Sequence, residues 1–244
     1  MSEGNHKVAL ITGGAVRVGA ALSLGFAEAG YHVAVNYHKS DGEARALARR
    51  IGKLGRRVAL LQGSVASEDD AQRMIDEAER ELGRLDVLVN SASVFREAQL
   101  LSIDATEWDE VMAVNLRGPF LMAKFAERLL RVSRGSIINI VDVSALRPWA
   151  RYPHHSVSKA ALLHLTKVMA KAFAPHVRVN AIAPGTVLPP EGSPPQELER
   201  ERRKTLLDRL GSPDDVVQAA LFLAGASYVT GDVILVDGGL ALGS

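Results

Sequence analysis

Three side chains near position 155 have the types and the spacing that proton transfer needs. Tyr152, His155 and Lys159 lie three and four residues apart, so a helix would place them on one face. A protonated imidazole is a competent acid near neutral pH, and a phenol is a second proton donor. Asp142, 13 residues before His155, could orient the imidazole and favour its charged form, which Lys159 would oppose. These residues predict a site of acid–base chemistry.

A glycine-rich segment near the N-terminus has the composition of a diphosphate-binding turn. Residues 12–19 read TGGAVRVG and stand between an apolar run and an amphipathic, helical pattern. Glycines let the backbone turn tightly and approach a pyrophosphate, and the helix N-terminus that follows supplies free N–H groups and a positive dipole end. Many strand–helix turns carry glycine for steric reasons alone. The strand before this turn and the helix after it favour a dinucleotide site.

The end of the second predicted strand bears on which nicotinamide cofactor binds. An acidic residue there binds the 2′-hydroxyl of NAD, whereas cations accept the 2′-phosphate of NADP. Residues 36–40 read NYHKS, and no acid follows until Asp41. Lys39 supplies a cation, His38 a titratable base, and Arg17 could add a second charge. A solvated surface turn would explain the same residues, but together with the glycine-rich turn they favour NADPH.

Short β-branched runs alternate with longer amphipathic stretches along the chain. Strands are predicted over residues 8–11, 32–37, 58–61, 86–89, 136–141, 177–182 and 233–236. Helices are predicted over residues 18–29, 41–54, 67–82, 108–132, 154–173 and 197–209, and from Ser212 onward. This alternation predicts an α/β fold in which a parallel, doubly wound, seven-stranded sheet is covered by helices on both faces. Residues 1–244 are predicted to form a single domain.

The composition excludes several classes of protein. The 244 residues are 47% hydrophobic and 23% charged, and the net charge is +1 with scattered basic residues, so no nucleic-acid partner is expected. The chain has no cysteine, and the adjacent His154 and His155 are a poor metal pair, so no metal site is expected. Neither a signal segment nor an apolar stretch of about 18 residues occurs. We therefore expect a soluble, cytoplasmic protein without a membrane partner.

The TGGAVRVG turn resembles the Thr-Gly-x-x-x-Gly-x-Gly loop of the short-chain dehydrogenase/reductase family, with Arg17 where the middle glycine is expected. Arginine at this place is similar to the pteridine reductase branch of the family, which includes dihydromonapterin-type reductases. The resemblance runs from Val8 to Gly239. It implies a Rossmann-type fold, an NADPH-dependent oxidoreductase, a homotetramer, and a substrate lid over residues 184–208.

The resemblance also implies which residues contact the cofactor and the substrate. The segment NSAS over residues 90–93 looks like the family's Asn-Asn-Ala-Gly, while Ser64 departs from the usual aspartate beside adenine. The implied cofactor contacts are Gly13, Arg17, Val18, Gly19, Tyr37, His38, Lys39, Ser40, Ser64, Val65, Asn90, Ser91, Ala92, Lys159, Pro184 and Gly185. The implied substrate contacts are Ser93, Phe95 and Trp149. As an ordinary core aromatic, Phe95 would be equally unsurprising.

The family's catalytic residues map onto this chain with one departure. Lys159 and Asn115 match its lysine and asparagine, and Asp142 stands where the pteridine reductases carry aspartate instead of serine. The catalytic tyrosine of the Tyr-x-x-x-Lys motif is His155 here.

Three interpretations of this departure stay open. His155 takes over the proton donation, or Tyr152 supplies the proton as in enoyl-thioester reductases of the same superfamily, or the pocket binds NADPH without chemistry. In the first two, the chain is an enzyme that reduces a small carbonyl or a pterin-like substrate. In the third, it is a catalytically impaired NADP(H)-binding protein. Because Asp142, Asn115 and Lys159 are all retained, the enzyme interpretations are favoured.

Overall fold

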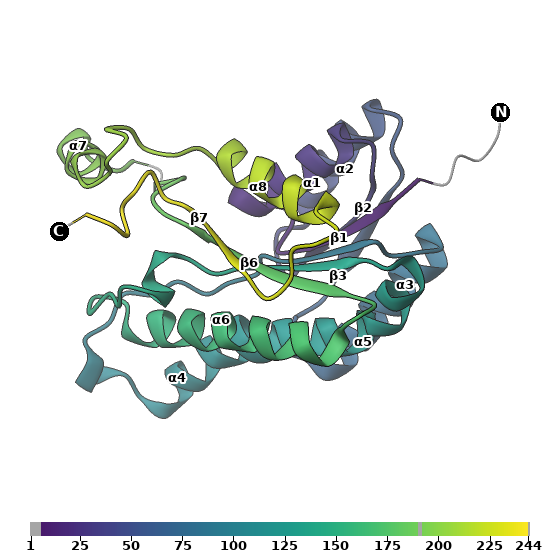
Figure 1. The fold of residues 1–244 in the computed structure, drawn as a ribbon, viewed down its shortest axis with the longest axis horizontal. Coiled ribbons are helices and arrows are strands. Elements are labelled where there is room, and N and C mark those ends of the chain that lie inside the picture. The colour runs from purple at the N-terminus through teal and green to yellow at the C-terminus, as the bar shows by residue number, and fades with distance from the viewer. Residues whose placement is uncertain (1–5, 190–191, 244) are drawn as a thin grey trace.

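Seven strands form one parallel sheet at the centre of the molecule (Figure 1). The computed structural model describes residues 6–189 and 192–243. The strands are β1 (Val8–Thr12), β2 (His32–Tyr37), β3 (Val58–Gln62), β4 (Val87–Asn90), β5 (Ser136–Ile140), β6 (Arg178–Pro184) and β7 (Val233–Val236). Their order is β3-β2-β1-β4-β5-β6-β7, and each neighbouring pair is parallel. The predicted single-domain, doubly wound fold is confirmed.

Helices cover both faces of this sheet (Figure 1). One face carries α1 (Arg17–Glu28), α2 (Asp41–Lys53) and α8 (Pro213–Gly225). The other carries α3 (Glu68–Leu82), α5 (Gly118–Ser133) and α6 (Pro153–Phe173), with α4 (Ala105–Met112) packed on α6. Helix α7 (Pro195–Arg203) lies beyond the sheet, on the same side as the C-terminus. Two short 3₁₀ helices span Leu100–Ser102 and Val143–Ala145.

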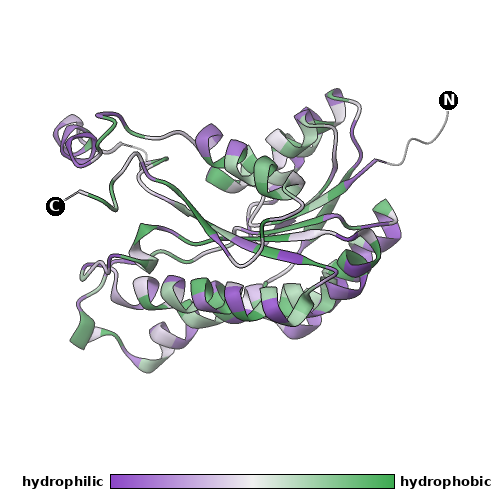
Figure 2. Ribbon diagram, viewed as in Figure 1, coloured by the Kyte–Doolittle hydropathy of each residue, from purple (hydrophilic) through white to green (hydrophobic). Residues whose placement is uncertain are grey.

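The core is split by the sheet into two apolar layers. Successive strand residues point to opposite faces, so Ala9 and Ile11 pack into the layer under α1 and α8, while Leu10 packs into the layer under α3 and α5. Both faces of the central strands are therefore apolar, as a buried parallel sheet requires. Figure 2 shows the result, with hydrophobic colour on the sheet and polar colour on the outward helix faces and on α7.

The predicted helix boundaries at α3 and α8 agree with capping chemistry. The Ser67 side chain accepts the N–H of Asp70 at the start of α3, and Gly83, with φ 80°, ends that helix in the left-handed conformation. Ser212 and Asp215 form a capping box at the start of α8. These local signals fix helix ends without any tertiary contact.

Two predicted helices are corrected by the structure. The helix predicted over 108–132 begins earlier, because Asp104 caps α4, and a π-helical turn at Ala113–Arg117 separates α4 from α5. The helix predicted over 197–209 ends at Arg203. Beyond it the chain is drawn toward the C-terminal segment, where the Leu207 N–H donates to the carbonyl of Gly238 (3.1 Å), a contact that no local pattern reveals.

No helix within residues 6–189 and 192–243 is long and apolar enough to cross a membrane. In those same ranges, no group of three or more histidine or acidic side chains is arranged to hold a metal ion. The carboxyl ends of β1, β4, β5 and β6 meet along one edge of the sheet, which is where ligands bind in open α/β sheets. The predicted site residues follow these strand ends.

Candidate active site

A cavity of about 1240 Å³ opens at the carboxyl edge of the sheet. It is walled by the β1–α1 turn, the segment after β4, the chain from β5 into α6, the chain between β6 and α7, and the C-terminal segment. The predicted residues that line it are Gly13, Arg17, Val18, Gly19, Ser91, Ala92, Ser93, Phe95, Asp142, Trp149, Tyr152, His155, Lys159, Pro184 and Gly185. A second hollow of about 970 Å³ beside α4 and α5 contains none of the predicted site residues.

Several predicted cofactor contacts do not line the cavity. His38 and Lys39 are exposed just past the end of β2, with Ser40 beside them, whereas Tyr37 is buried and its hydroxyl donates to Asp41 (2.9 Å). The Tyr37 side chain is thus engaged within the fold and does not line the cavity. Val65 and Asn90 do not line it either, because Val65 packs against Gly118 and the Asn90 amide, buried in the sheet, donates to Oδ1 of Asn139 (2.8 Å). Their predicted contacts with the cofactor stay predictions.

The β1–α1 turn has the shape and the free donors that a diphosphate needs. A Cβ added to Gly19 would lie 2.1 Å from the carbonyl oxygen of Gly13, so only glycine fits there. Helix α1 begins after Val16 with no side-chain cap and no acidic residue in its first turn. Its first N–H groups are therefore left for a ligand, and the positive end of the helix dipole faces the cavity. These features fit the phosphates of a dinucleotide.

Two polar residues that the sequence analysis missed hold this turn in place. Asn36, buried in β2, accepts the N–H of Gly13 through Oδ1 (3.1 Å), and its Nδ2 donates to the carbonyl of Gly63 (3.0 Å). Thr12 accepts the N–H groups of Ser91 and Ala92 through Oγ1 (3.0 and 3.1 Å). The available signal was a polar residue within an otherwise apolar strand, since a buried polar group must have hydrogen-bond partners.

Arg17 bridges two walls of the cavity, the β1–α1 turn and the chain between β6 and α7. Its backbone has φ 51°, in the left-handed region that favours glycine, at the position where the family motif has glycine. Its guanidinium donates to the carbonyl of Leu188, in the segment between β6 and α7 (2.7 Å). The guanidinium predicted to meet a phosphate thus ties the β1–α1 turn to the predicted lid.

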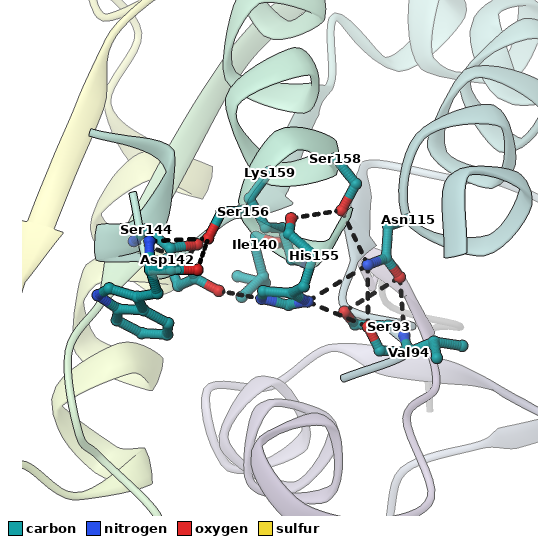
Figure 3. A network of polar contacts seen from close by, with 11 residues as sticks. Ser93, Val94, Asn115, Ile140, Asp142, Ser144, His155, Ser156, Ser158 and Lys159 are labelled. Carbon is teal, nitrogen blue, oxygen red and sulfur yellow. Dashed lines mark hydrogen bonds and ion pairs between the residues drawn. The ribbon is translucent and has the colours of Figure 1, made fainter. Parts of the chain in front are cut away.

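His155 is held at both ring nitrogens (Figure 3). Its Nε2 lies 2.5 Å from Oδ2 of Asp142, and its Nδ1 lies 3.1 Å from the carbonyl oxygen of Val94. Asn115 is fixed by the Val94 N–H, which donates to its Oδ1 (2.7 Å), so its Nδ2 points toward the Val94 carbonyl and Ser158 Oγ (3.0 Å each). The Asn115 Nδ2 also lies 3.4 Å from Nδ1 of His155, so Nδ1 faces both a carbonyl acceptor and an amide donor, while Nε2 faces only the carboxylate of Asp142 among the described residues.

Burial and charge shift two pKa values around this pair. Burial would raise the pKa of the Asp142 carboxyl, but the hydrogen bond from His155 and the charges of His155 and Lys159 outweigh it and hold the pKa below its usual value. Burial lowers the pKa of Lys159, opposed by the Asp142 charge. The Lys159 ammonium donates to the carbonyl of Ile140 (2.8 Å) at the end of β5. Asp142 is therefore an anion between two basic groups.

The structure corrects the prediction that Tyr152 shares one helix face with His155 and Lys159. It is the residue before α6, with φ −134° and ψ 59°, so its side chain leaves the helix direction. Its ring stacks on Phe95, with centroids 4.1 Å apart and planes 21° apart. His155 and Trp149 meet the same Phe95 edge to face, at 4.7 and 6.5 Å. Within the described residues, the Tyr152 hydroxyl makes no hydrogen bond.

Comparison with known proteins shows which family the chain belongs to. The family model described as enoyl-(acyl carrier protein) reductase matches residues 14–241. The 3-oxoacyl-[acyl-carrier-protein] reductase FabG of Staphylococcus epidermidis is 33% identical and aligns with 96% of this chain and 99% of that protein. The L-rhamnose 1-dehydrogenase (NAD(P)(+)) of a Sphingomonas species is 34% identical, with 96% of each chain aligned. The chain therefore belongs to the short-chain dehydrogenase/reductase family and has the family's oxidoreductase fold.

One similar solved structure contains a cofactor. The crystal structure of FolM alternative dihydrofolate reductase 1 from Brucella suis in complex with NADP has a TM-score of 0.91 against this chain. The two are 33% identical, and the match covers 98% of this chain and 96% of that one. Nicotinamide dinucleotides are thus the cofactors of the family and of this similar structure.

Proposed function

We propose that this chain is an NADPH-dependent reductase that transfers hydride to a small, flat substrate, a pterin-like C=N or C=C bond or a small carbonyl. The observation that carries the proposal is the joint placement of two features in one cavity. A diphosphate-binding turn at Gly13–Gly19 opens onto the aromatic group Phe95, Trp149 and Tyr152. Similarity to the FolM alternative dihydrofolate reductase in complex with NADP supports an NADP(H)-dependent reductase, and the pterin-like substrate is our extension of that similarity.

The chain's own residues would hold the cofactor at three places. The N–H groups at the start of α1 bind the diphosphate. Lys39 and His38, exposed past β2, and Arg17 above the groove meet the 2′-phosphate of NADPH. Lys159, which is buried at the cavity wall, would hold the nicotinamide ribose, the role that the resemblance to the family implies. When bound, NADPH supplies the hydride.

The proton would come from the His155–Asp142 pair. The Nε2–H of the imidazole is directed at Asp142 beside the cavity, and this is the proton that the pair would supply. Asp142 orients the ring and is itself kept ionised, as its lowered pKa indicates. The aromatic face of Phe95 stacks against a flat ring and excludes water from it. Hydride and proton would then add to the same bond.

The structure also gives a specific reason to keep Tyr152 as the rival donor. Both nitrogens of His155 already contact protein acceptors, whereas the Tyr152 hydroxyl lines the cavity without a partner among the described residues. The enoyl-type interpretation assigns it the proton. The two assignments make opposite predictions for single substitutions.

The test follows NADPH oxidation by the purified protein with a quinonoid dihydropterin, dihydrofolate and a panel of small carbonyls. His155→Phe should lower kcat/KM by about 10²-fold or more on the substrate that is reduced, because it removes the proton and keeps the contact with Phe95. Tyr152→Phe should retain activity, as should Tyr228→Phe, a fully exposed surface control. A loss of activity in Tyr152→Phe but not in His155→Phe would assign the proton donation to Tyr152.

The same assay separates an enzyme from a non-catalytic binding protein. Tight NADPH binding without turnover on any member of the panel would support the non-catalytic interpretation. Binding and turnover together support the reductase, and Lys159→Ala should then lower both, because Lys159 lines the cavity and its charge interacts with Asp142.

A further inference from the structure

The C-terminal segment after β7 turns back and forms part of the cavity wall. Leu240 and Gly243 both line the cavity. The turn is closed by Asp237, whose carboxylate accepts the N–H groups of Gly239 (2.9 Å) and Ala241 (2.7 Å). We call residues 237–243 the C-terminal strap. It is the last described part of the chain, and in Figure 1 it lies on the same side as α7.

A single guanidinium holds the far end of this strap. Nη1 of Arg147 donates to the carbonyl oxygens of Leu240 (2.9 Å) and Ala241 (3.5 Å), and to that of Gly243. No carboxylate among the described residues pairs with Arg147, so its charge is directed to these carbonyls. Arg147 itself follows the 3₁₀ helix that starts after Asp142, and its N–H donates to the carbonyl of Val143 (2.9 Å). The strap is thus attached to the segment that carries the acidic site residue.

The other side of the strap contacts the predicted lid. The Leu207 N–H donates to the carbonyl of Gly238 (3.1 Å), and a Cβ added to Gly239 would lie 2.8 Å from Cδ1 of Leu206. Leu206 also lines the cavity. The strap therefore lies between the end of the lid and Arg147, and it closes the cavity on that side.

We propose that the Arg147-held strap is a length gate for the substrate, and that Arg147 is a specificity-determining residue acting through the strap. This rests on the proposed function, because it concerns the substrate of that cavity. Leu240, Gly243 and Arg147 all line the cavity, so a long substituent that extends from a ring at Phe95 toward the strap would meet them, whereas a short one would not reach them. Releasing the strap removes that exclusion without touching the His155–Asp142 pair.

The test compares two probes on the full-length chain with NADP present. A dihydropterin with a short side chain and dihydrofolate, which extends the same ring by p-aminobenzoylglutamate, are titrated by calorimetry and assayed with NADPH. In Arg147→Ala, the preference for the short probe should fall by about tenfold in both Kd and kcat/KM. Truncation after Gly239 should give the same change, and the double variant no more than either, because both remove one wall. Arg117→Ala is the matched control, since among the described residues the Arg117 side chain donates to the carbonyl of Ala66 alone, and Arg117 does not line this cavity.

Hydrogen exchange of residues 238–243 supplies a readout that needs no substrate. Arg147→Ala should speed exchange in the strap, and Arg117→Ala should not. Unchanged exchange, or faster exchange with an unchanged preference, would overturn the length gate. A stronger preference for the short probe in Arg147→Ala would also overturn it, because Arg147 would then be binding the glutamate carboxylate directly. Failure of the wild-type chain to bind either probe would instead contradict the proposed function.

Discussion

The His155–Asp142 contact places a carboxylate against an imidazole away from water, with Nε2 and Oδ2 2.5 Å apart and the imidazole almost fully buried. Taking such groups from water has a free-energy penalty that their attraction often only offsets, so a buried ion pair is weak evidence for stability. Removing one partner is different, because it leaves an unpaired buried charge. We therefore interpret the His155–Asp142 pair as serving proton transfer rather than stability.

Asp142→Asn tests this pair through stability. The variant keeps the shape but leaves the buried imidazole without its anion, so the free energy of unfolding at pH 7 should fall by about 3 kcal/mol. The folded-state pKa of Asp142 is below its usual value near 3.8, so the unfolded chain binds the proton more readily. The stabilisation is therefore full above about pH 5 and is lost as the pH falls through the lowered pKa.

The measurement is denaturant unfolding of both proteins at pH 7 and between pH 3 and 5, and the difference between them should shrink toward the acid end. Glu110→Gln, which breaks the exposed pair with Arg96, should leave the curve nearly unchanged. A gap between wild type and Asp142→Asn that stays constant with pH would contradict the assignment of an ionised Asp142.

At the scale of elements, the β1–α1 turn works because two stretches of backbone nearly touch. The carbonyl of Gly13 lies where a Cβ of Gly19 would be, and a Cβ on Gly13 would lie 2.9 Å from Cα of Ala92. This close approach brings the start of α1 next to the end of β4, so the N–H groups and the substrate end of the cavity share one wall. The glycine requirement is steric, and it exists whether or not a ligand is bound.

Gly19→Ala should therefore disturb both folding and cofactor binding. The added methyl group must displace backbone, so we expect a loss of about 1–3 kcal/mol in the free energy of unfolding and weaker NADPH binding by at least about tenfold. Gly52→Ala is the matched control, because a Cβ there meets nothing within 4 Å and alanine is the better helix former in α2. Thermal unfolding and calorimetry with NADPH measure both effects. Equal stability and equal NADPH affinity in Gly19→Ala and Gly52→Ala would contradict the steric requirement for glycine at position 19.

At the scale of the whole molecule, the cavity joins segments that are far apart along the chain. The first turn, the segment after β4, the β5–α6 chain, the lid and the C-terminal strap each supply part of its wall. A ligand that spans this cavity contacts all of them only in the folded state. Binding must therefore stabilise the whole fold rather than one loop.

NADPH at 100 times its Kd should raise the free energy of unfolding by about 2.7 kcal/mol, which corresponds to a rise in Tm of roughly 5–10 °C for a chain of this size. Lys39→Ala should lose most of this shift with NADPH and keep the shift with NADH, because it removes a cation for the 2′-phosphate. Lys53→Ala, exposed at the end of α2, serves as the control. Equal losses with both cofactors would contradict the phosphate contact, and no shift with either would remove the dinucleotide site.

Local periodicity, glycine sterics and residue spacing were enough to predict the alternation of strands and helices, the glycine-rich turn and the grouping of Asp142, His155 and Lys159. How these groups face one another became visible only in the folded chain. Tyr152 leaves the helix face, both nitrogens of His155 are engaged, and the C-terminal strap reaches the cavity through Arg147. Hydrogen bonds between residues far apart in the chain set these arrangements, and local sequence patterns do not predict such bonds.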